Sequence, residues 1–175
     1  MNHIIFITGA AASGKSSVAR LLAKQFPKSL HLQVDHLREM MVNGVDLPRG
    51  QEWSDETTRQ FQWARSAASY MSQLYANEGV DVIIDDVCFP PEFAEQYRVL
   101  FQNSAVHRIL LLPRPEALVE RMQKRAGPYD KFLIELIPWV YSYLDPMPKA
   151  GWIVLDSSNW TIKQTVQEVL RRIGV

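Results

Sequence analysis

The segment GAAASGKS at positions 9–16 constrains the fold of this chain more than any other part of the sequence. It matches the pattern G-x-x-x-x-G-K-[ST] at every fixed position, with an apolar run before it and a helical pattern after it. Glycine at both ends of the pattern permits backbone torsions that a Cβ would hinder. The N–H groups of such a loop converge on an anion, and the following helix directs its positive end there. The segment therefore predicts a phosphate-binding loop between a strand and a helix.

The residues of this loop have expected roles in holding a nucleotide. Lys15 is expected to reach the β- and γ-phosphates of ATP, and the hydroxyl of Ser16 to bind Mg²⁺. A turn of small residues before a helix is the alternative, and the strand–loop–helix context disfavours it. The expected nucleotide-binding residues are Gly9, Ala10, Ala11, Ala12, Ser13, Gly14, Lys15, Ser16 and Ser17.

Length and composition are those of an ordinary folded domain. The chain has 175 residues, 47% of them hydrophobic, and 19 Lys and Arg balance 19 Asp and Glu. We expect one domain over residues 1–175. The balanced charge argues against nucleic-acid binding and against an anionic membrane surface. No signal peptide or membrane-spanning run is visible. Since Cys88 is the only cysteine, a cytoplasmic setting is expected, and we assign Cys88 no chemistry.

Short β-rich runs alternate with helical patterns along the chain. Because several of the runs are almost continuously apolar, they indicate parallel strands covered on both faces. The expected strands are residues 3–8, 30–34, 80–85, 106–112 and 152–156. The expected helices are residues 15–26, 54–77, 92–101, 116–125, 130–143 and 161–173. This alternation predicts an α/β fold with right-handed crossovers, in which ligands bind at the carboxyl ends of the strands.

Asp35 follows the second expected strand, and Arg38 lies one helical turn further on. A carboxylate at that strand end is suited to orient a hydroxyl group or to accept its proton. Arg38 is suited to pair with an anionic or polar acceptor. Two alternatives stay open: Asp35 as the cap of a helix starting near His36, and Arg38 as a solvated surface residue.

Asp85 and Asp86 end the third expected strand. Mg²⁺ prefers oxygen ligands, so one of these carboxylates is expected to hold the metal together with Ser16. If the strand continues through both residues, their side chains point in opposite directions, and both cannot serve equally. The sequence does not say which one serves, and an acidic pair at the start of a turn is the alternative.

Three of these features together resemble the P-loop kinases, the group that includes shikimate, gluconate and adenylate kinases. They are the loop at 9–16, the Val34–Asp35 pair, and the segment IIDDV at 83–87, and the closest resemblance is to chloramphenicol-phosphotransferase-like proteins. The resemblance implies a three-layer fold with a five-stranded parallel sheet in the order 2-3-1-4-5 and a helical lid. It also implies ATP- and Mg²⁺-dependent phosphoryl transfer to a hydroxyl of a small molecule, with Asp35 as the base or positioning group.

In the kinases that this chain resembles, a lid carries arginines that close over the ATP phosphates. The corresponding segment is 121–143, where Arg121 and Arg125 are expected to stabilise the charge on the transferred group. Gly127–Pro128 would end the first lid helix and act as a hinge. The alternative is a solvated basic helix end, which the helix dipole also favours.

The acceptor is expected to bind at residues 43–78, where Arg59 is a further substrate-binding candidate. This region also offers Arg49, Trp53, Gln62, Trp63 and Arg65. The two tryptophans either contact the acceptor or pack between helix and sheet, and the aromatic cluster at 139–143 is interpreted as packing. Trp160 lies either near the adenine base or in the core. As alternatives to the small-molecule kinase we consider a nucleotide-binding regulatory module with little or no ATPase activity, and a kinase of nucleic-acid ends.

Overall fold

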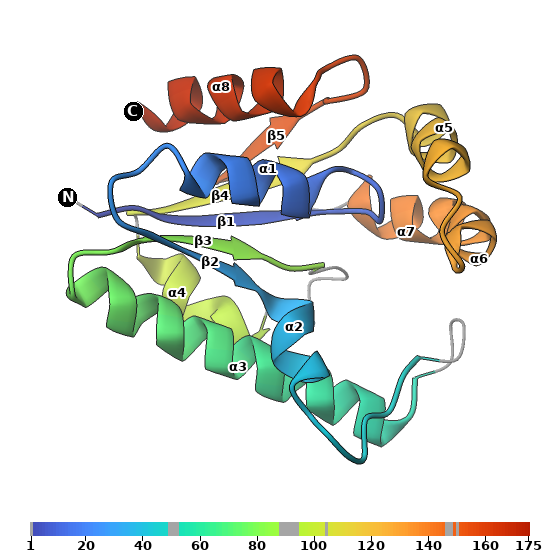
Figure 1. The fold of residues 1–175 in the computed structure, drawn as a ribbon, viewed down its shortest axis with the longest axis horizontal. Coiled ribbons are helices and arrows are strands. Elements are labelled where there is room, and N and C mark those ends of the chain that lie inside the picture. The colour runs from blue at the N-terminus through green and yellow to red at the C-terminus, as the bar shows by residue number, and fades with distance from the viewer. Residues whose placement is uncertain (1, 49–52, 88–94, 104, 146–148, 150) are drawn as a thin grey trace.

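The apolar run before the phosphate-binding loop forms β1 (Ile4–Gly9), and every residue of this strand is buried. In the computed structural model, which describes residues 2–48, 53–87, 95–103, 105–145, 149 and 151–175, β1 is the central strand of a sheet (Figure 1). The sheet has five parallel strands in the order β2-β3-β1-β4-β5. The other strands are β2 (Ser29–Gln33), β3 (Asp81–Asp85), β4 (Val106–Leu111) and β5 (Trp152–Leu155). The predicted fold class and strand order are confirmed.

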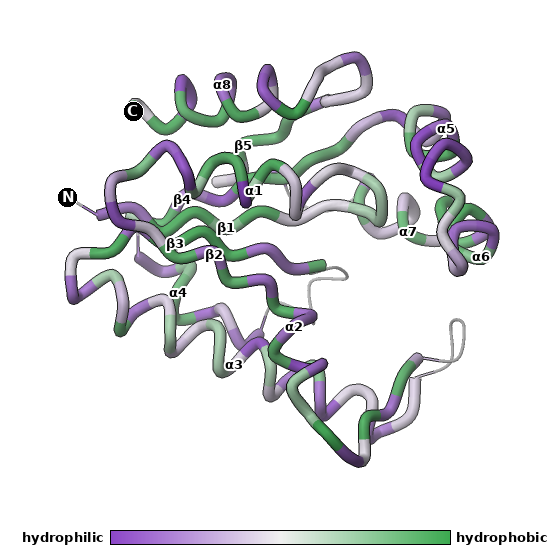
Figure 2. The backbone as a smooth tube through the Cα atoms, in the orientation of Figure 1, coloured by the Kyte–Doolittle hydropathy of each residue, from purple (hydrophilic) through white to green (hydrophobic). Residues whose placement is uncertain are grey.

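Helices cover both faces of the sheet, because alternate residues of each strand point to opposite faces. On one face, Ile5 and Ile7 pack with α1 (Lys15–Ala23) and α8 (Ile162–Ile173). On the other face, Ile4 and Phe6 pack with α3 (Asp55–Asn77) and α4 (Arg98–Gln102). Figure 2 shows that the strands between these helices are largely hydrophobic, with β1 the most uniformly so.

Three helices after β4 form a separate group at the loop end of the sheet (Figure 1). They are α5 (Pro115–Arg125), α6 (Asp130–Glu135) and α7 (Ile137–Leu144). Their apolar side chains pack with Ala10 of the loop and Leu110 of β4. The single helix predicted over 130–143 is wrong, because the chain breaks at Leu136. Pro138 has no N–H to continue the earlier helix, and it fits the first turn of α7 instead.

One further segment differs from the prediction, and another lies partly outside the described residues. β2 ends at Gln33, and the short helix α2 (Val34–Glu39) begins at once. Of the helix predicted over 92–101, residues 95–97 form a 3-10 turn and α4 begins at Arg98. Residues 92–94, Cys88 and Arg49 lie outside the described residues. Within the described part of the chain, no helix is both long and apolar enough to cross a membrane.

Candidate active site

The loop between β1 and α1 has the backbone geometry that its sequence predicts. Gly14, the N-cap of α1, has a φ of 96°, a left-handed conformation that glycine adopts without strain. Gly9 has no room for a side chain, because an added Cβ would lie 2.4 Å from the carbonyl oxygen of Leu111 and 2.7 Å from Oγ of Ser13. Both glycines of the motif are therefore required by the structure.

Lys15 is held back against the loop from which it extends. Its Nζ donates to the carbonyl oxygen of Ala10 at 3.3 Å. Burial lowers the pKa of Lys15, and the charges of Asp85, Asp35 and Asp86 oppose that effect. The three carboxylates singled out in the sequence are therefore gathered around one lysine by two segments of the fold, the start of α2 and the end of β3.

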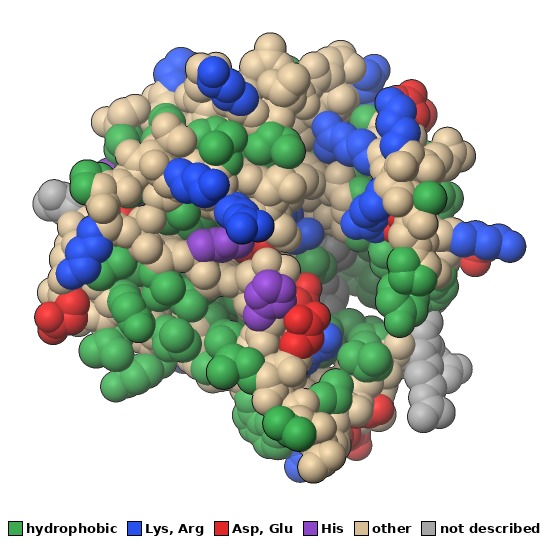
Figure 3. Space-filling view, in the orientation of Figure 1, with side chains coloured by type: hydrophobic (Ala, Val, Ile, Leu, Met, Phe, Trp, Pro, Cys, Tyr) green, Lys and Arg blue, Asp and Glu red, His purple; other side chains and the backbone are tan. Residues whose placement is uncertain are grey.

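The loop is a wall shared by two cavities. The smaller, of about 390 Å³, is lined by Ala12, Ser13 and Gly14 of the loop, and we call it the base-side cavity. The larger, of about 460 Å³, is lined by Ala10 and Ala11, and we call it the lid-side cavity. The larger hollow lies between the α5–α7 group and the α2–α3 side of the molecule (Figure 3). A group bound on the loop would therefore lie between two separate binding spaces.

Arg121 lines the base-side cavity, where it ties the loop to the segment after β5. Its Nη1 donates to the carbonyl oxygens of Ala12 and Ser13, at 3.4 and 3.3 Å. Its Nη2 donates to the carbonyl oxygen of Ser157 at 2.5 Å. The guanidinium of Arg121 is thus engaged with backbone oxygens of the loop and of the segment after β5, and its closure over the transferred phosphoryl group stays a prediction. Trp160 lines the same cavity and not the core.

Arg125, one turn after Arg121, belongs to a different set of contacts. Its guanidinium donates to both carboxylate oxygens of Asp130, with Nε 3.0 Å from Oδ2. The N–H of Gly127 donates to the same Oδ2 at 2.8 Å. This arrangement joins the end of α5 to the start of α6 across the predicted hinge. The positive charge of Arg125 also lowers the pKa of Lys15, although its effect is smaller than those of burial and of the three carboxylates.

One oxygen of Asp86 is engaged by two contacts within the protein. The Nε of Arg65 donates to its Oδ2 at 2.9 Å, and the hydroxyl of Tyr97 donates to the same oxygen at 3.1 Å. All three residues are buried. Burial raises the pKa of Asp86, and Arg65 opposes this. The carboxylate therefore joins β3 to α3 and to the segment before α4.

Asp85 lies in the opposite environment, next to β2 and α1, as the alternation of a strand predicts. Its Oδ2 is 3.7 Å from Nε2 of His31. Both atoms are buried, and neither has a hydrogen-bond partner among the described residues. Among the carboxylates whose charges raise the pKa of Lys15, Asp85 has the largest effect. Asp85 therefore has a buried oxygen that can bind a ligand, whereas Oδ2 of Asp86 already accepts two hydrogen bonds.

The residues present fit a magnesium ion that is shared with a nucleotide. Among the described residues, no group of three or more His, Cys, Asp and Glu side chains could hold a metal on its own. Mg²⁺, however, is commonly held by one or two protein oxygens together with phosphates and water. The buried, unpartnered oxygen of Asp85 suits that arrangement, with the hydroxyl of Ser16 as the second protein ligand.

Asp35 and Arg38 both line the lid-side cavity. Asp35 is exposed in the first turn of α2, where Gln33 is the N-cap, so the alternative of Asp35 as the cap is ruled out. The guanidinium of Arg38 lies 3.8 Å from the centre of the Phe61 ring. Its Nε and Nη1 are buried without a hydrogen-bond partner in the part of the chain that the structure describes. Burial lowers the pKa of Arg38, and Asp35 opposes this.

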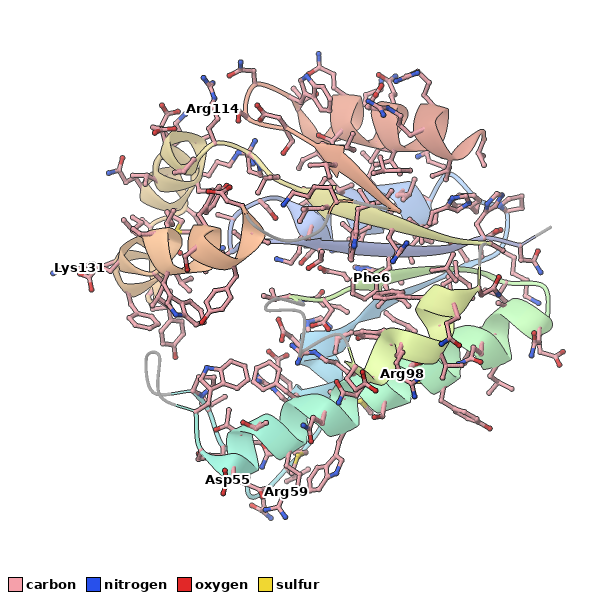
Figure 4. The ribbon with its side chains drawn as sticks, turned by 180° about the vertical axis from the view of Figure 1, so that it is seen from behind. Phe6, Asp55, Arg59, Arg98, Arg114 and Lys131 are labelled. Carbon is pink, nitrogen blue, oxygen red and sulfur yellow. The ribbon has the colours of Figure 1, made fainter. Side chains whose placement is uncertain are left out.

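The structure does not bring Arg59 to this cavity. Arg59 is exposed on α3, 2.6 Å from Glu56, on the side turned away from the sheet (Figure 4). Trp63 is 53% exposed and also lies outside the cavity lining. The alternative in which Trp63 packs between helix and sheet is therefore wrong. The reason is the helical period, which turns these two positions of α3 to solvent.

Aromatic residues from both the acceptor region and the 139–143 cluster contribute to the lid-side cavity. Trp53 stacks on Phe61, with ring centres 4.5 Å apart, and both line the cavity. Trp139 of α7 lines it from the other side and packs edge-on against Tyr143. The interpretation of Trp139 as packing alone was incomplete. The sequence did carry a signal for this role. Residues 132–140 are almost all apolar, more than a helix needs in order to pack against the sheet on one face.

The sheet order, the loop and the helices after β4 define a protein with the P-loop nucleotide-binding fold. A sequence-family comparison agrees, since AAA_33, described as an AAA domain, matches residues 4–135. The chain belongs to this family. A search of curated protein sequences finds no match to the chain.

Solved structures with the same fold include several kinases. A sugar kinase from Janibacter sp. superposes with a TM-score of 0.71 at 18% identity, covering 100% of this chain and 96% of the other. Shikimate kinase from Bacteroides thetaiotaomicron has a TM-score of 0.67 at 17% identity, covering 99% of each chain. The tunicamycin resistance protein of Deinococcus radiodurans has a TM-score of 0.65 at 16% identity, covering 100% and 97%. At these identities the likeness shows the fold.

Proposed function

We propose that the protein transfers the γ-phosphoryl group of ATP to a hydroxyl of a small molecule. One observation carries the proposal: the phosphate-binding loop is the common wall of two cavities, and a carboxylate, Asp35, lies on only one side of it. A nucleotide in one cavity and an acceptor in the other would meet at the loop. The kinase titles among the similar structures support the same class of reaction.

The base-side cavity suits the nucleotide base, which would lie between Arg121 and Trp160. The phosphates would bind the N–H groups of the loop and the ammonium of Lys15. Ser16 and Asp85 would hold Mg²⁺, which neutralises charge on the phosphates when it is bound. Asp86 is left out of this metal site because Arg65 and Tyr97 occupy it.

The acceptor hydroxyl would lie beside Asp35 in the lid-side cavity. Its oxygen attacks the γ-phosphorus, the bond from that phosphorus to the bridging oxygen of ADP breaks, and the hydroxyl proton passes to the carboxylate of Asp35. Residues 43–78 and the lid, 121–143, supply the walls. Arg125 is positioned by Asp130 near the loop, and it is the lid arginine that we assign to the transferred group.

The test is ADP formation from Mg-ATP with a panel of hydroxylated acceptors: sugars, sugar acids, shikimate, nucleosides, aminoglycosides and aromatic alcohols. The variants are Lys15→Met, which keeps the side-chain length but not the charge, and Asp35→Asn. We expect stimulation by one class of acceptor, and its loss in Lys15→Met. Asp35→Asn should reduce transfer by about 10²-fold or more while ATP binding is kept.

Two results would count against this function. Tight ATP binding without stimulation by any acceptor would favour a nucleotide-binding regulatory module. Full activity of Lys15→Met would exclude the loop as the phosphate site. A loss of ATP binding in Asp35→Asn that equals its loss of transfer would give Asp35 a structural role.

A further inference from the structure

We propose that the acceptor is an aromatic hydroxy acid: a molecule whose flat apolar body fills the lid-side cavity and whose anionic group binds Arg38. This inference rests on the proposed function, which it narrows to a class of substrate. It distinguishes the acceptor from the sugars and sugar acids that carry a hydroxyl on most of their carbons.

The walls of the lid-side cavity are aromatic on both sides. Trp53 and Phe61 line it from the α3 side, and Tyr129, Phe132 and Trp139 line it from the lid. Aliphatic side chains of α6 and α7, such as Leu136, fill the space between them. Each sugar hydroxyl loses its bonds to water on binding and needs a protein partner in exchange. Walls of this kind offer few such partners, whereas they suit a planar ring.

The charged residues that line the cavity among the described residues are Asp35, Arg38 and Arg65. Arg65 donates to Asp86 and, from Nη2 at 2.8 Å, to the carbonyl oxygen of Val87. Asp35 has its role at the reacting hydroxyl. Arg38 therefore remains as the cationic group available to a ligand.

Arg38 has unmet hydrogen-bonding capacity inside the cavity. Its Nε and Nη1 are buried and without a partner in the described part of the chain, while the flat face of its guanidinium lies 3.8 Å from the ring centre of Phe61. Leaving buried donors of a charged group unpaired is costly, and an anionic oxygen is the partner that removes the cost most effectively. The stacking on Phe61 fixes the plane in which such a group would approach.

The spacing of Asp35 and Arg38 limits where the two ends of the acceptor lie. They are three positions apart on α2, so their side chains are neighbours on one helix face, with Cβ atoms about 5–6 Å apart. The reacting hydroxyl and the anionic group therefore lie within a few bonds of each other in the acceptor. The ring extends from them toward Trp53 and Trp139.

The test uses four acceptors that separate ring from charge: 3-phenyllactate, 3-phenylpropane-1,2-diol, glycerate and gluconate. The readout is kcat/KM for Lys15-dependent ADP formation. We expect 3-phenyllactate to exceed the neutral diol by about tenfold or more through Arg38, and to exceed glycerate by a similar factor through the ring. A preference for gluconate, or for the neutral diol, would overturn the inference while leaving the kinase function in place.

Two variants assign these preferences to their residues. Arg38→Gln should remove the preference for 3-phenyllactate over the diol through KM, because kcat/KM falls much more for the acid than for the diol. Arg98→Gln is the control because Arg98 is exposed and pairs with Glu95. Trp139→Ala should remove the preference over glycerate, with the exposed Tyr70→Ala as its control. Equal losses on acid and diol in Arg38→Gln would show that Arg38 acts on the fold and not on the charge. An absence of Lys15-dependent turnover on every acceptor would instead contradict the proposed function.

Discussion

At the scale of single residues, the carboxyl end of β3 separates two adjacent carboxylates. Asp86 accepts hydrogen bonds from Arg65 and Tyr97, which lie on elements that cover one face of the sheet. Asp85 lies on the other face, with a buried oxygen that no described residue bonds. Asp85 and Asp86 are the same residue type, but successive side chains of a strand point to opposite faces of the sheet, so the two carboxylates have different neighbours.

This difference predicts unequal effects of two matched substitutions. Asp86→Asn removes the charge that balances the buried Arg65, and we expect it to lower the free energy of unfolding by about 3 kcal/mol. Asp85→Asn should lower it by less, and should instead weaken the dependence of turnover on Mg²⁺. Urea unfolding and a magnesium titration of ADP formation check both. Equal destabilisation by the two variants would contradict the assignment.

Gly9 is a second residue whose role comes from a neighbour distant in sequence. In Gly9→Ala the new Cβ would lie 2.4 Å from the backbone oxygen of Leu111 in β4, so the central strands must shift. We expect a loss of at least about 2 kcal/mol together with a loss of ATP binding. Gly174→Ala is the matched control, because Gly174 has a φ of 79° with nothing within 4 Å, and it should cost only about 1 kcal/mol. Thermal unfolding of the two variants separates the steric effect from the effect of positive φ.

At the scale of elements, the two arginines of α5 connect different parts of the molecule. Arg121 holds the phosphate-binding loop against the segment after β5. Arg125 holds α5 to α6 through Asp130. A base bound next to Arg121 would therefore contact the same helix, α5, that carries Arg125. Helix α5 is thus the physical link between the base-side and lid-side cavities.

The α5–α6 connection has a predictable pH dependence. The hydrogen bond from Arg125 lowers the pKa of Asp130, so the folded state favours the ionised carboxylate. The stabilisation is therefore fully present above the unfolded pKa of about 3.9 and is lost as the pH falls through the lower, folded value. In Asp130→Asn the fall in stability between about pH 5 and about pH 3 should be shallower than in the unaltered protein. Urea midpoints measured across this range check the prediction, and an unchanged slope would contradict it.

At the scale of the whole molecule, the site is assembled at one edge of the sheet. The loop follows β1, Asp35 follows β2, Asp85 ends β3, and helices α5 to α7 follow β4. Because parallel strands share one carboxyl edge, four separate chain segments meet there. The lid-side cavity then lies between the helices after β4 and the α2–α3 side (Figure 3).

A ligand that bridges these segments should stabilise the whole fold. Binding of Mg-ATP at about 100 times its dissociation constant adds about 2.7 kcal/mol, which for a chain of this size raises Tm by roughly 5–10 °C. Lys15→Met should show a much smaller rise, although its own Tm without ligand stays close to that of the unaltered protein. Thermal unfolding with and without Mg-ATP checks this, and equal rises in both proteins would contradict a role for Lys15 in nucleotide binding.

The sequence alone determined what depends on consecutive residues or on a repeating period. The loop at 9–16 is a local motif, so its strand–loop–helix setting was readable directly, and the apolar runs showed a parallel sheet. The strand order followed from a resemblance, not from the residues themselves. The start of α3 is likewise a local feature, because the side chain of Ser54 caps the helix by accepting a hydrogen bond from the N–H of Thr57.

The tertiary structure alone decided which side chains meet. The contact between Arg121 and Ser13 joins residues 108 positions apart, and that between Arg65 and Asp86 joins residues 21 apart on different elements. No local pattern specifies such partners, because they depend on how helices pack on the sheet. For the same reason, Trp139 faces a cavity while Arg59 faces solvent. The motif thus fixed where phosphate chemistry is expected, and packing selected the residues that surround it.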